Sequence, residues 1–275
     1  MGNDNPFNKT TEQLSSYRHL EKMSTEQIVQ SINDEDEKVA GAVRKELSSI
    51  IILIDALTEK LQNNGRLFYV GAGTSGRLGI LDASEWAPTF GVAETLVNGV
   101  MAGGPAALRF GIEDAEDSYE DGWKDLQQYN VSQKDFVIGI AASGTTPYVV
   151  GALQQCRNNG ILTGCIVCNS GSPVAAHADY PVEVIVGPEF VTGSTRMKSG
   201  TAQKMVLNMI STSVMIKLGR VHDNRMVHMK INNQKLIERG TKMFMEKSGI
   251  TDYEKAKALL IKYGSVYTAL KNMKT

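Results

Sequence analysis

The hydrophobic positions of the chain follow a helical spacing over a long stretch near its start. Apolar residues recur three and four positions apart between residues 34 and 63 and line one face: Val39, Val43, Leu47, Ile50, Ile54, Leu57 and Leu61. Ahead of them, Ser24 to Gln27 has the form of a capping box, in which Ser24 caps a helix and Gln27 reaches back to it. The pattern predicts a long helix that ends at Asn63-Asn64-Gly65.

From Arg66 onward the pattern changes to short apolar runs that alternate with helical segments. Five runs have the length of a strand, namely residues 66–70, 95–100, 136–141, 164–168 and 182–187. They are apolar on both faces, which is typical of strands in a buried parallel sheet. Helical patterns occupy residues 76–86, 104–125, 147–159, 172–178 and 201–218. The alternation predicts a doubly wound α/β fold, with a mainly parallel five-stranded sheet, flanking helices and binding sites at the carboxyl ends of the strands.

The two ends of the chain differ from this middle part. Residues 1–23 are polar and carry no strong repeat, so we expect an arm that needs a partner surface to be ordered. Residues 224–275 are helical in pattern and rich in lysine. We therefore predict an N-terminal arm (1–23), an α/β domain that begins with a helix (24–222) and a C-terminal helical segment (223–275).

The composition excludes several classes of protein. Lys and Arg number 29 against 30 Asp and Glu, for a net charge of −1, so the chain lacks the basic surface that nucleic-acid binding needs. The longest apolar run, Ile50 to Ile54, is far shorter than the roughly 18 residues of a membrane helix. The N-terminus has no apolar core of a signal peptide. We expect a cytoplasmic protein without nucleic-acid or membrane partners.

The cysteines and histidines carry no pattern of a metal or disulfide site. Three cysteines are too few for a disulfide framework. Cys165 and Cys168 lie along a predicted strand at a spacing that places them on opposite faces, so we expect both to be buried. The four histidines show no metal-ligand spacing. We expect neither a metal nor a cofactor.

A glycine-rich loop, Gly71 to Gly76, follows the first predicted strand and opens a helix. It matches the dinucleotide fingerprint GxGxxG, but the next strand ends at Val97 to Val100 without the acidic residue that would hold a ribose. Free N–H groups at a helix N-terminus, together with the hydroxyls of Thr74 and Ser75, suit a single phosphate better. We predict that Gly73 and these two residues bind phosphate.

A second loop repeats this design after the strand at 136–141. It contains Ser143, Gly144, Thr145 and Thr146 and precedes another helix. Small residues let the backbone approach a ligand closely, and the hydroxyls stand at the positive end of the helix. Two such loops on one α/β sheet indicate a phosphorylated ligand.

A third polar segment, Gly193 to Gly200, comes before the long apolar helix. It could be a flexible linker, but Arg196 and Lys198 lie beside three hydroxyls, including that of Ser194, which suits an anionic ligand. We interpret the segment as facing the substrate, with Glu189 just ahead of it as a further ligand contact.

The helix predicted after this segment, at 201–218, is apolar nearly all round. Such a helix is buried. In an α/β protein with one domain it often packs against a second copy, so we predict a homodimer.

Taken together, these motifs resemble the sugar isomerase (SIS) domain, a phosphosugar-binding fold. Within that superfamily the sequence is most similar to the N-acetylmuramic acid 6-phosphate etherases, over roughly residues 20–240. The resemblance is carried by residues 65–85 (GRLFYVGAGTSGRLGILDASE), 88–92, 102–104, 139–153, 168–173 and 186–212, the last containing the specific block GSTRMKSGTAQK.

The resemblance implies a lyase that removes D-lactate from the C3 ether of N-acetylmuramic acid 6-phosphate in peptidoglycan recycling. Two carboxyl groups with separated pKa values can do this without a metal or cofactor. The family's two glutamates map onto Glu85 and Glu116. Apolar neighbours of Glu85 predict a buried carboxyl with a raised pKa. Glu116 lies in the acidic run 113–121, which is otherwise typical of a solvated helix face.

The chain departs from the family pattern in a few places. Trp86-Ala87 replaces the usual Cys-Pro, Thr145 stands where arginine is common, and the C-terminal tail ends early at Thr275. Two alternatives of the same fold stay open. One is a phosphosugar-binding regulator without catalysis, and the other is a sugar-phosphate isomerase, which would leave the C3 substituent intact.

Overall fold

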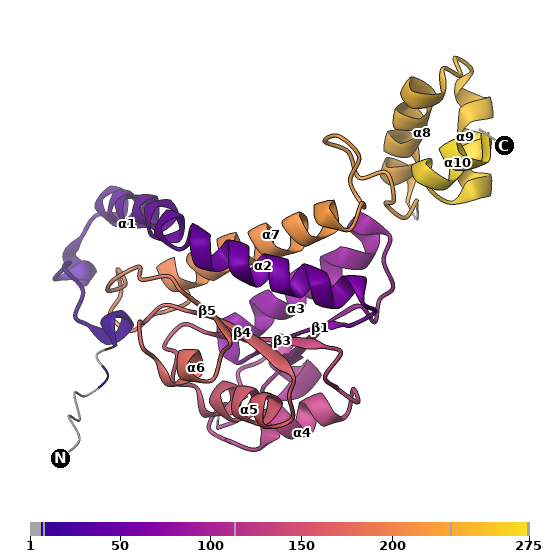
Figure 1. The fold of residues 1–275 in the computed structure, drawn as a ribbon. Coiled ribbons are helices and arrows are strands. Elements are labelled where there is room, and N and C mark those ends of the chain that lie inside the picture. The colour runs from indigo at the N-terminus through magenta and orange to yellow at the C-terminus, as the bar shows by residue number, and fades with distance from the viewer. Residues whose placement is uncertain (1–6, 8, 113, 232, 274–275) are drawn as a thin grey trace.

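The structure is a computed structural model that describes residues 7, 9–112, 114–231 and 233–273. The described part centres on a sheet of five strands in the order β2-β1-β3-β4-β5, with every neighbouring pair parallel (Figure 1). The strands are β1 (Leu67–Gly71), β2 (Val97–Met101), β3 (Phe136–Ala141), β4 (Leu162–Val167) and β5 (Tyr180–Glu183). The predicted doubly wound α/β fold is therefore confirmed.

Helices cover both faces of the sheet (Figure 1). One face carries α1 (Thr25–Lys45), α2 (Leu47–Gln62), α3 (Gly73–Phe90) and α7 (Lys198–Lys217), and the other carries α4 (Asp121–Gln127), α5 (Pro147–Asn158) and α6 (Pro173–Ala176). Phe68 and Tyr69 are neighbours on β1, and they lie in two different hydrophobic clusters. Alternating strand residues thus supply both cores, as the pleat requires.

The helix α7 lies against α1, α2 and α3 of its own chain. Its apolar residues, among them Val206 and Ile210, are buried there. The predicted burial of this helix is confirmed, but helices of the same chain bury it. The apolar character of α7 therefore does not require contact with a second copy of the chain.

The predicted boundaries of three elements were wrong. The capping box at Ser24 and Gln27 forms and starts α1 directly, and the long helix breaks at Glu46 before α2. The last strand ends at Glu183 because β5 is an edge strand and its only neighbour, β4, ends at Val167.

The third wrong boundary lies in the predicted helix 104–125. Within the described residues there, only the short 3-10 helix η3 (Gly104–Leu108) and the start of α4 are helical. Gly103, Gly104 and Asp114 adopt positive φ angles, which an α-helix does not allow. The acidic run therefore forms an irregular segment rather than a helix face, and its first residue, Glu113, lies outside the described residues.

The N-terminal arm packs against its own chain. It contains two 3-10 helices, η1 (Thr10–Glu12) and η2 (Leu20–Lys22), and its residues Thr11 and Ser15 are buried. The surface that orders the arm thus belongs to the same chain, and not to a partner as we expected.

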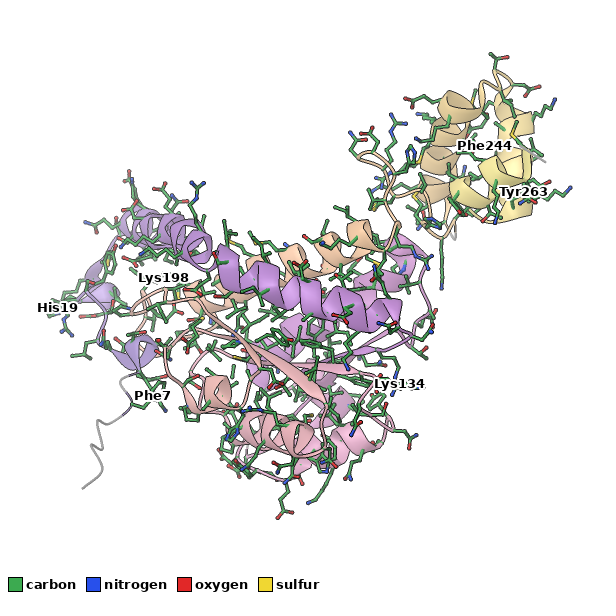
Figure 2. All side chains as sticks on the ribbon, viewed as in Figure 1. Phe7, His19, Lys134, Lys198, Phe244 and Tyr263 are labelled. Atoms are coloured by element: carbon green, nitrogen blue, oxygen red, sulfur yellow. The ribbon has the colours of Figure 1, made fainter. Side chains whose placement is uncertain are left out.

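The C-terminal helices α8 (Gln234–Ser248), α9 (Tyr253–Tyr263) and α10 (Val266–Met273) pack around a hydrophobic cluster of their own. Phe244 and Leu260 are fully buried in it, and the three helices stand away from the sheet (Figures 1 and 2). The division of the chain at residue 222 stays a prediction.

The cysteines are buried as expected. Cys165 lies in the cluster on one face of the sheet and Cys168 in the cluster on the other. Burial raises the pKa of all three thiols, including that of Cys156, to about 12. None of the helices in the described ranges combines the length and the apolar character that crossing a bilayer requires.

Candidate active site

The two glycine-rich loops meet at the point where the strand order of the sheet reverses. β1 and β3 are neighbours, with Gly71 opposite Ile140, but their following helices, α3 and α5, pack on opposite faces. Loops that follow such strands diverge and leave a crevice at the carboxyl edge of the sheet. The structure therefore brings the predicted loops at 73–75 and 143–146 to one edge.

The first loop is built by close backbone packing. A Cβ atom on Gly71 would lie 2.8 Å from the nitrogen of Gly76, and one on Gly76 would lie 2.8 Å from the carbonyl oxygen of Gly71. Gly73 begins α3 with a φ of +52°, which favours glycine. The glycines thus let α3 start directly above β1, where its first N–H groups face the crevice edge.

Ser75 links this loop to α7. Its buried hydroxyl donates a hydrogen bond to Oε1 of Gln203 at 2.9 Å. Among the described residues, Nε2 of Gln203 is buried without a hydrogen-bond partner. The start of α7 also lies beside Thr74, since a Cβ on Gly200 would be 3.6 Å from Cγ2 of Thr74. The structure therefore brings the third polar segment to the first loop.

The second loop is held by its own hydroxyls and by α6. Oγ of Ser143 accepts hydrogen bonds from the backbone nitrogen and the hydroxyl of Thr145, both at 3.2 Å. Gly144 has a φ of +71°, and a Cβ there would lie 2.4 Å from Cβ of Ser172. Thr146 follows, just ahead of Pro147, and is half-buried. Thr145, in place of an arginine, thus supports the loop itself.

Two residues that we predicted to contact a ligand bind other residues of the chain instead. The buried carboxylate of Glu189 accepts hydrogen bonds from the backbone nitrogens of Lys198 and Ser199 and from the hydroxyl of Ser199. It thereby caps the first turn of α7. The ammonium of Lys198 is also buried, and it pairs with Glu35 of α1. Ser194 is half-buried and Arg196 is exposed, so these two remain open to a ligand.

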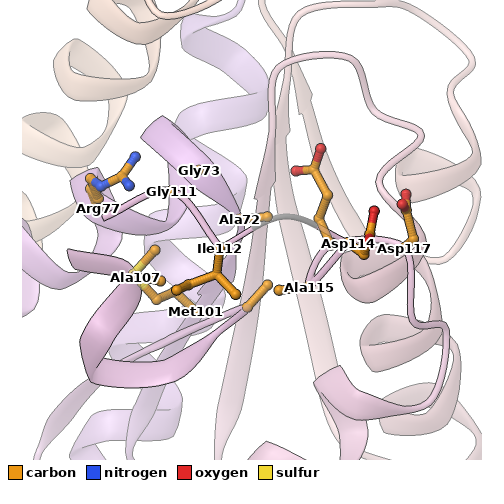
Figure 3. A pocket seen from close by; sticks show the side chains of 12 residues that line it. Ala72, Gly73, Arg77, Met101, Ala107, Gly111, Ile112, Asp114, Ala115 and Asp117 are labelled. Carbon is orange, nitrogen blue, oxygen red and sulfur yellow. The ribbon is translucent and has the colours of Figure 1, made fainter. Parts of the chain in front are cut away.

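A cavity of about 430 Å³ opens beside the first loop, within the range of volumes usual for small-molecule sites. Glu116 and Gly73 both line it. Figure 3 shows Arg77 on one side and Asp114 and Asp117 on the other. Arg77 lies within the GAGTSGR motif, but we did not predict a role for it from the sequence.

Arg77 holds the chain segment that leads to Glu116. Its guanidinium donates to the carbonyl oxygens of Leu108 at 3.3 Å and Phe110 at 3.2 Å. The backbone oxygen of Glu116 accepts a hydrogen bond from the nitrogen of Tyr148 at the start of α5. The irregular segment is thus fixed at two points between the two loops.

Glu85 lies elsewhere, and the prediction that it is buried is wrong. It is exposed on α3, about 18 Å along the helix axis from Gly73 at 1.5 Å per residue, and it does not line the cavity. The helical repeat turns Trp86 and Ala87 toward the core and leaves Glu85 on the solvent side.

The buried carboxyl of this turn belongs to Asp82, which we did not predict from the sequence. It accepts hydrogen bonds from Tyr69 at 3.1 Å and Trp86 at 3.0 Å, and it also binds Ser211 and Lys204 of α7. This network fixes α3 against α7. In the described ranges, no group of three or more His, Cys, Asp or Glu side chains could hold a metal ion.

Known proteins match the chain at two levels. Residues 49–157 match the family described as glucokinase regulatory protein N-terminal SIS domain, and residues 115–213 match the SIS domain. The fold is similar to that of a solved protein of Escherichia coli CFT073, with a TM-score of 0.53, 20% identity, and coverage of 74% of this chain and 97% of that one. A phosphoheptose isomerase from Francisella tularensis gives a TM-score of 0.54, 14% identity, and coverage of 70% and 100%.

Whole-length relatives are much more similar in sequence. The N-acetylmuramic acid 6-phosphate etherase of Porphyromonas gingivalis is 59% identical, over 98% of this chain and 97% of the relative. The protein of the same name from Bacteroides thetaiotaomicron is 58% identical, over 96% and 95%. That from Christiangramia forsetii is 57% identical, over 94% of both. With its SIS fold and this identity over nearly its whole length, the chain belongs to the N-acetylmuramic acid 6-phosphate etherase family.

Proposed function

We propose that this chain cleaves the D-lactyl ether of N-acetylmuramic acid 6-phosphate and releases N-acetylglucosamine 6-phosphate and D-lactate. The identity of 57–59% with relatives that carry this name, over nearly the full length, is the observation that carries the proposal. These relatives are named neither as regulators nor as isomerases. The three unpaired cysteines suit a reducing compartment, and we place the activity in the cytoplasm.

The phosphate of the substrate is assigned to the crevice between the two glycine-rich loops. The first N–H groups of α3 and the hydroxyl of Thr74 supply donors on one side. The hydroxyls of Ser143 and Thr146 supply donors on the other side, where Thr145 supports the loop by donating its hydroxyl to Ser143. Ser75 contributes through its backbone, because its hydroxyl already binds Gln203. Ser194 and Arg196 complete the rim, whereas Glu189 and Lys198 support it from inside.

The chemistry consists of an elimination followed by the addition of water. A carboxylate removes the C2 proton, which the aldehyde of the opened sugar makes acidic, and the C3–O bond breaks as a carboxyl group protonates the leaving lactate. Water then adds at C3 across the new double bond, and a proton returns to C2. Glu116 is our first acid/base group because it lines the cavity next to the phosphate loop.

Glu85 joins this reaction from a second copy of the chain. Within one chain it lies too far along α3 to reach a sugar held at Gly73. It is exposed, and Leu81, one turn earlier on the same helix, is 48% exposed. An exposed carboxylate beside an exposed apolar side chain on α3 fits a homodimer in which Glu85 of the partner subunit reaches the cavity.

The experiment that tests the function is incubation with N-acetylmuramic acid 6-phosphate in deuterium oxide. Lactate release with one deuterium at C2 of the product supports elimination and water addition. Formation of a ketose phosphate without lactate would instead support the isomerase alternative. Saturable binding without turnover would support the regulator alternative and leave both glutamates without a catalytic role.

A further inference from the structure

The N-terminal arm crosses the carboxyl edge of the sheet beside the proposed phosphate site. We use the name substrate arm for residues 10–17. The arm contacts Asn169, which follows β4, and then Phe190 and Thr192, which follow β5. Its glutamate, Glu12, reaches the third polar segment, since a Cβ on Gly193 would lie 3.3 Å from Oε2 of Glu12. The arm thus runs along the loops assigned to the substrate.

Asn169 joins the substrate arm to the second loop. The side chain is fully buried, and Nδ2 donates to the carbonyl oxygen of Ser143 at 3.0 Å and to the hydroxyl of Thr11 at 2.9 Å. Oδ1 accepts hydrogen bonds from the hydroxyl of Thr10 at 2.8 Å and from the backbone nitrogen of Thr11 at 3.2 Å. One amide therefore uses its donors and acceptor to connect two distant parts of the chain.

The far end of the arm is fixed in the same manner to the β5–α7 connection. The buried hydroxyl of Ser15 donates to the carbonyl oxygen of Phe190 at 2.7 Å, and its backbone nitrogen donates to the hydroxyl of Thr192 at 2.9 Å. Tyr17 packs against the Phe190 ring, with centroids 4.9 Å apart. The arm therefore links the loop at Ser143 to the chain that leads into Ser194 and Arg196.

We propose that Thr11 and Asn169 are positioning residues for the sugar phosphate, and that docking of the substrate arm and binding of the ligand stabilise each other. This inference rests on the assignment of Ser143 to Thr146 to the substrate. Asn169 holds the loop through the Ser143 carbonyl, and the docked arm fixes the Asn169 amide, so the arm adds to the contacts by which the loop's own hydroxyls and α6 set the loop's direction. Because coupling between two sites is reciprocal, a bound ligand holds the arm in turn.

The first test is kinetic and uses Thr11→Val, which removes the hydroxyl but keeps the shape. The variant removes the acceptor at 2.9 Å from Nδ2 of Asn169, which keeps the carbonyl oxygens of Ser143 at 3.0 Å and of Ala142 at 3.4 Å, and we expect KM to rise about tenfold with kcat within twofold. Thr11→Ser restores the hydroxyl and should restore KM. Ser16→Ala, at an exposed position of the same arm, is the matched control and should behave as wild type.

A second measurement separates positioning from a purely structural role. Hydrogen exchange is followed in the peptide that covers residues 10–17, with and without saturating N-acetylglucosamine 6-phosphate. The ligand should slow exchange of the Thr11 and Ser15 amides about tenfold, in keeping with reciprocal coupling. Unchanged exchange, or a Thr11→Val variant that only melts earlier at unchanged KM, would overturn the inference. A wild-type chain that neither binds nor cleaves these sugars would refute the proposed function instead.

Discussion

The ammonium of Lys198, at the start of α7, is buried against the carboxylate of Glu35 in α1. Lys38 contacts the same carboxylate from the solvent side. Next to this pair, Glu189 caps the backbone of α7. The charged residues around the GSTRMKSGTAQK block therefore hold the first turn of α7 against α1 and the β5–α7 connection, and only part of the block is left for a ligand.

Removal of one partner of this pair should destabilise the protein strongly. Lys198→Met leaves the buried Glu35 carboxylate with the exposed Lys38 alone, and breaking a buried pair costs about 3–5 kcal/mol. We expect the free energy of unfolding, measured in urea, to decrease by an amount near the lower end of that range. The double variant Lys198→Met with Glu35→Gln should regain much of the loss. Equal losses in the single and double variants would contradict a direct pairing.

The same pair predicts a dependence of stability on acid pH. Burial raises the pKa of Glu35, but hydrogen bonds from Lys198 and Lys38 outweigh it, so the pKa lies below the ordinary value of 4.5. A carboxyl whose pKa is lowered in the folded state stabilises the fold at every pH above its pKa in the unfolded chain. This contribution is lost as the pH falls through the pKa of the folded state. The free energy of unfolding measured in urea should therefore decrease as the pH falls below about 4.5. A Glu35→Gln variant should lose less stability over that interval.

Glu116→Gln should abolish turnover while leaving the fold intact. The change removes proton exchange without changing the volume of the side chain, which lines an open cavity and is exposed. Lactate release should fall by about 10³-fold or more, as expected for loss of an acid/base group. Binding of N-acetylglucosamine 6-phosphate, measured by calorimetry, should persist. Glu120→Gln, a nearby exposed glutamate outside the cavity, is the control, and near-normal activity in Glu116→Gln would remove Glu116 from the mechanism.

A mixture of two inactive variants should recover activity if the site spans two chains. Glu85→Gln and Glu116→Gln subunits, mixed and allowed to exchange, form hybrid dimers with one intact and one doubly altered site. Half of the dimers are then hybrids, and about a quarter of wild-type activity should return, as two-fold symmetry requires. No recovery, despite exchange verified by native mass spectrometry with one variant labelled with nitrogen-15, would show that each chain uses its own glutamates.

Arg77→Met should impair catalysis through the segment that carries Glu116. The variant removes the donors to the carbonyl oxygens of Leu108 and Phe110, so the segment loses one of its two attachments. We expect kcat to fall about 10- to 100-fold, since small displacements of a catalytic group have effects of this size. Arg109→Met, an exposed arginine in the same segment, serves as the control. Equal effects of both variants would argue for a general charge effect.

Much of the fold could be predicted because it depends on local pattern. The strands over β1 and β3, the capping box at Ser24 and the helix starts after both glycine loops follow from hydrophobic spacing and from residue types that allow close backbone packing. The opposite faces of Cys165 and Cys168 follow from the pleat alone. These features need only neighbouring residues to form.

Other features depend on partners distant in the sequence. Lys198 is buried because it pairs with Glu35. The carbonyl of Ser143 is bound by Asn169, which in turn binds Thr11. No spacing along the chain indicates which charged residue is paired inside and which is open to solvent.

The sequence by itself thus determined the α/β class, the positions of the two glycine-rich loops and the family, because these lie in short motifs with local geometry. Only the tertiary structure decided that Glu85 is exposed far from the cavity of Glu116, since helix α3 runs away from the loop at which it begins. It also decided that the arm docks on its own chain. Burial and hydrogen bonding of a polar group depend on what the folded chain brings beside it, and this is a property of packing rather than of pattern.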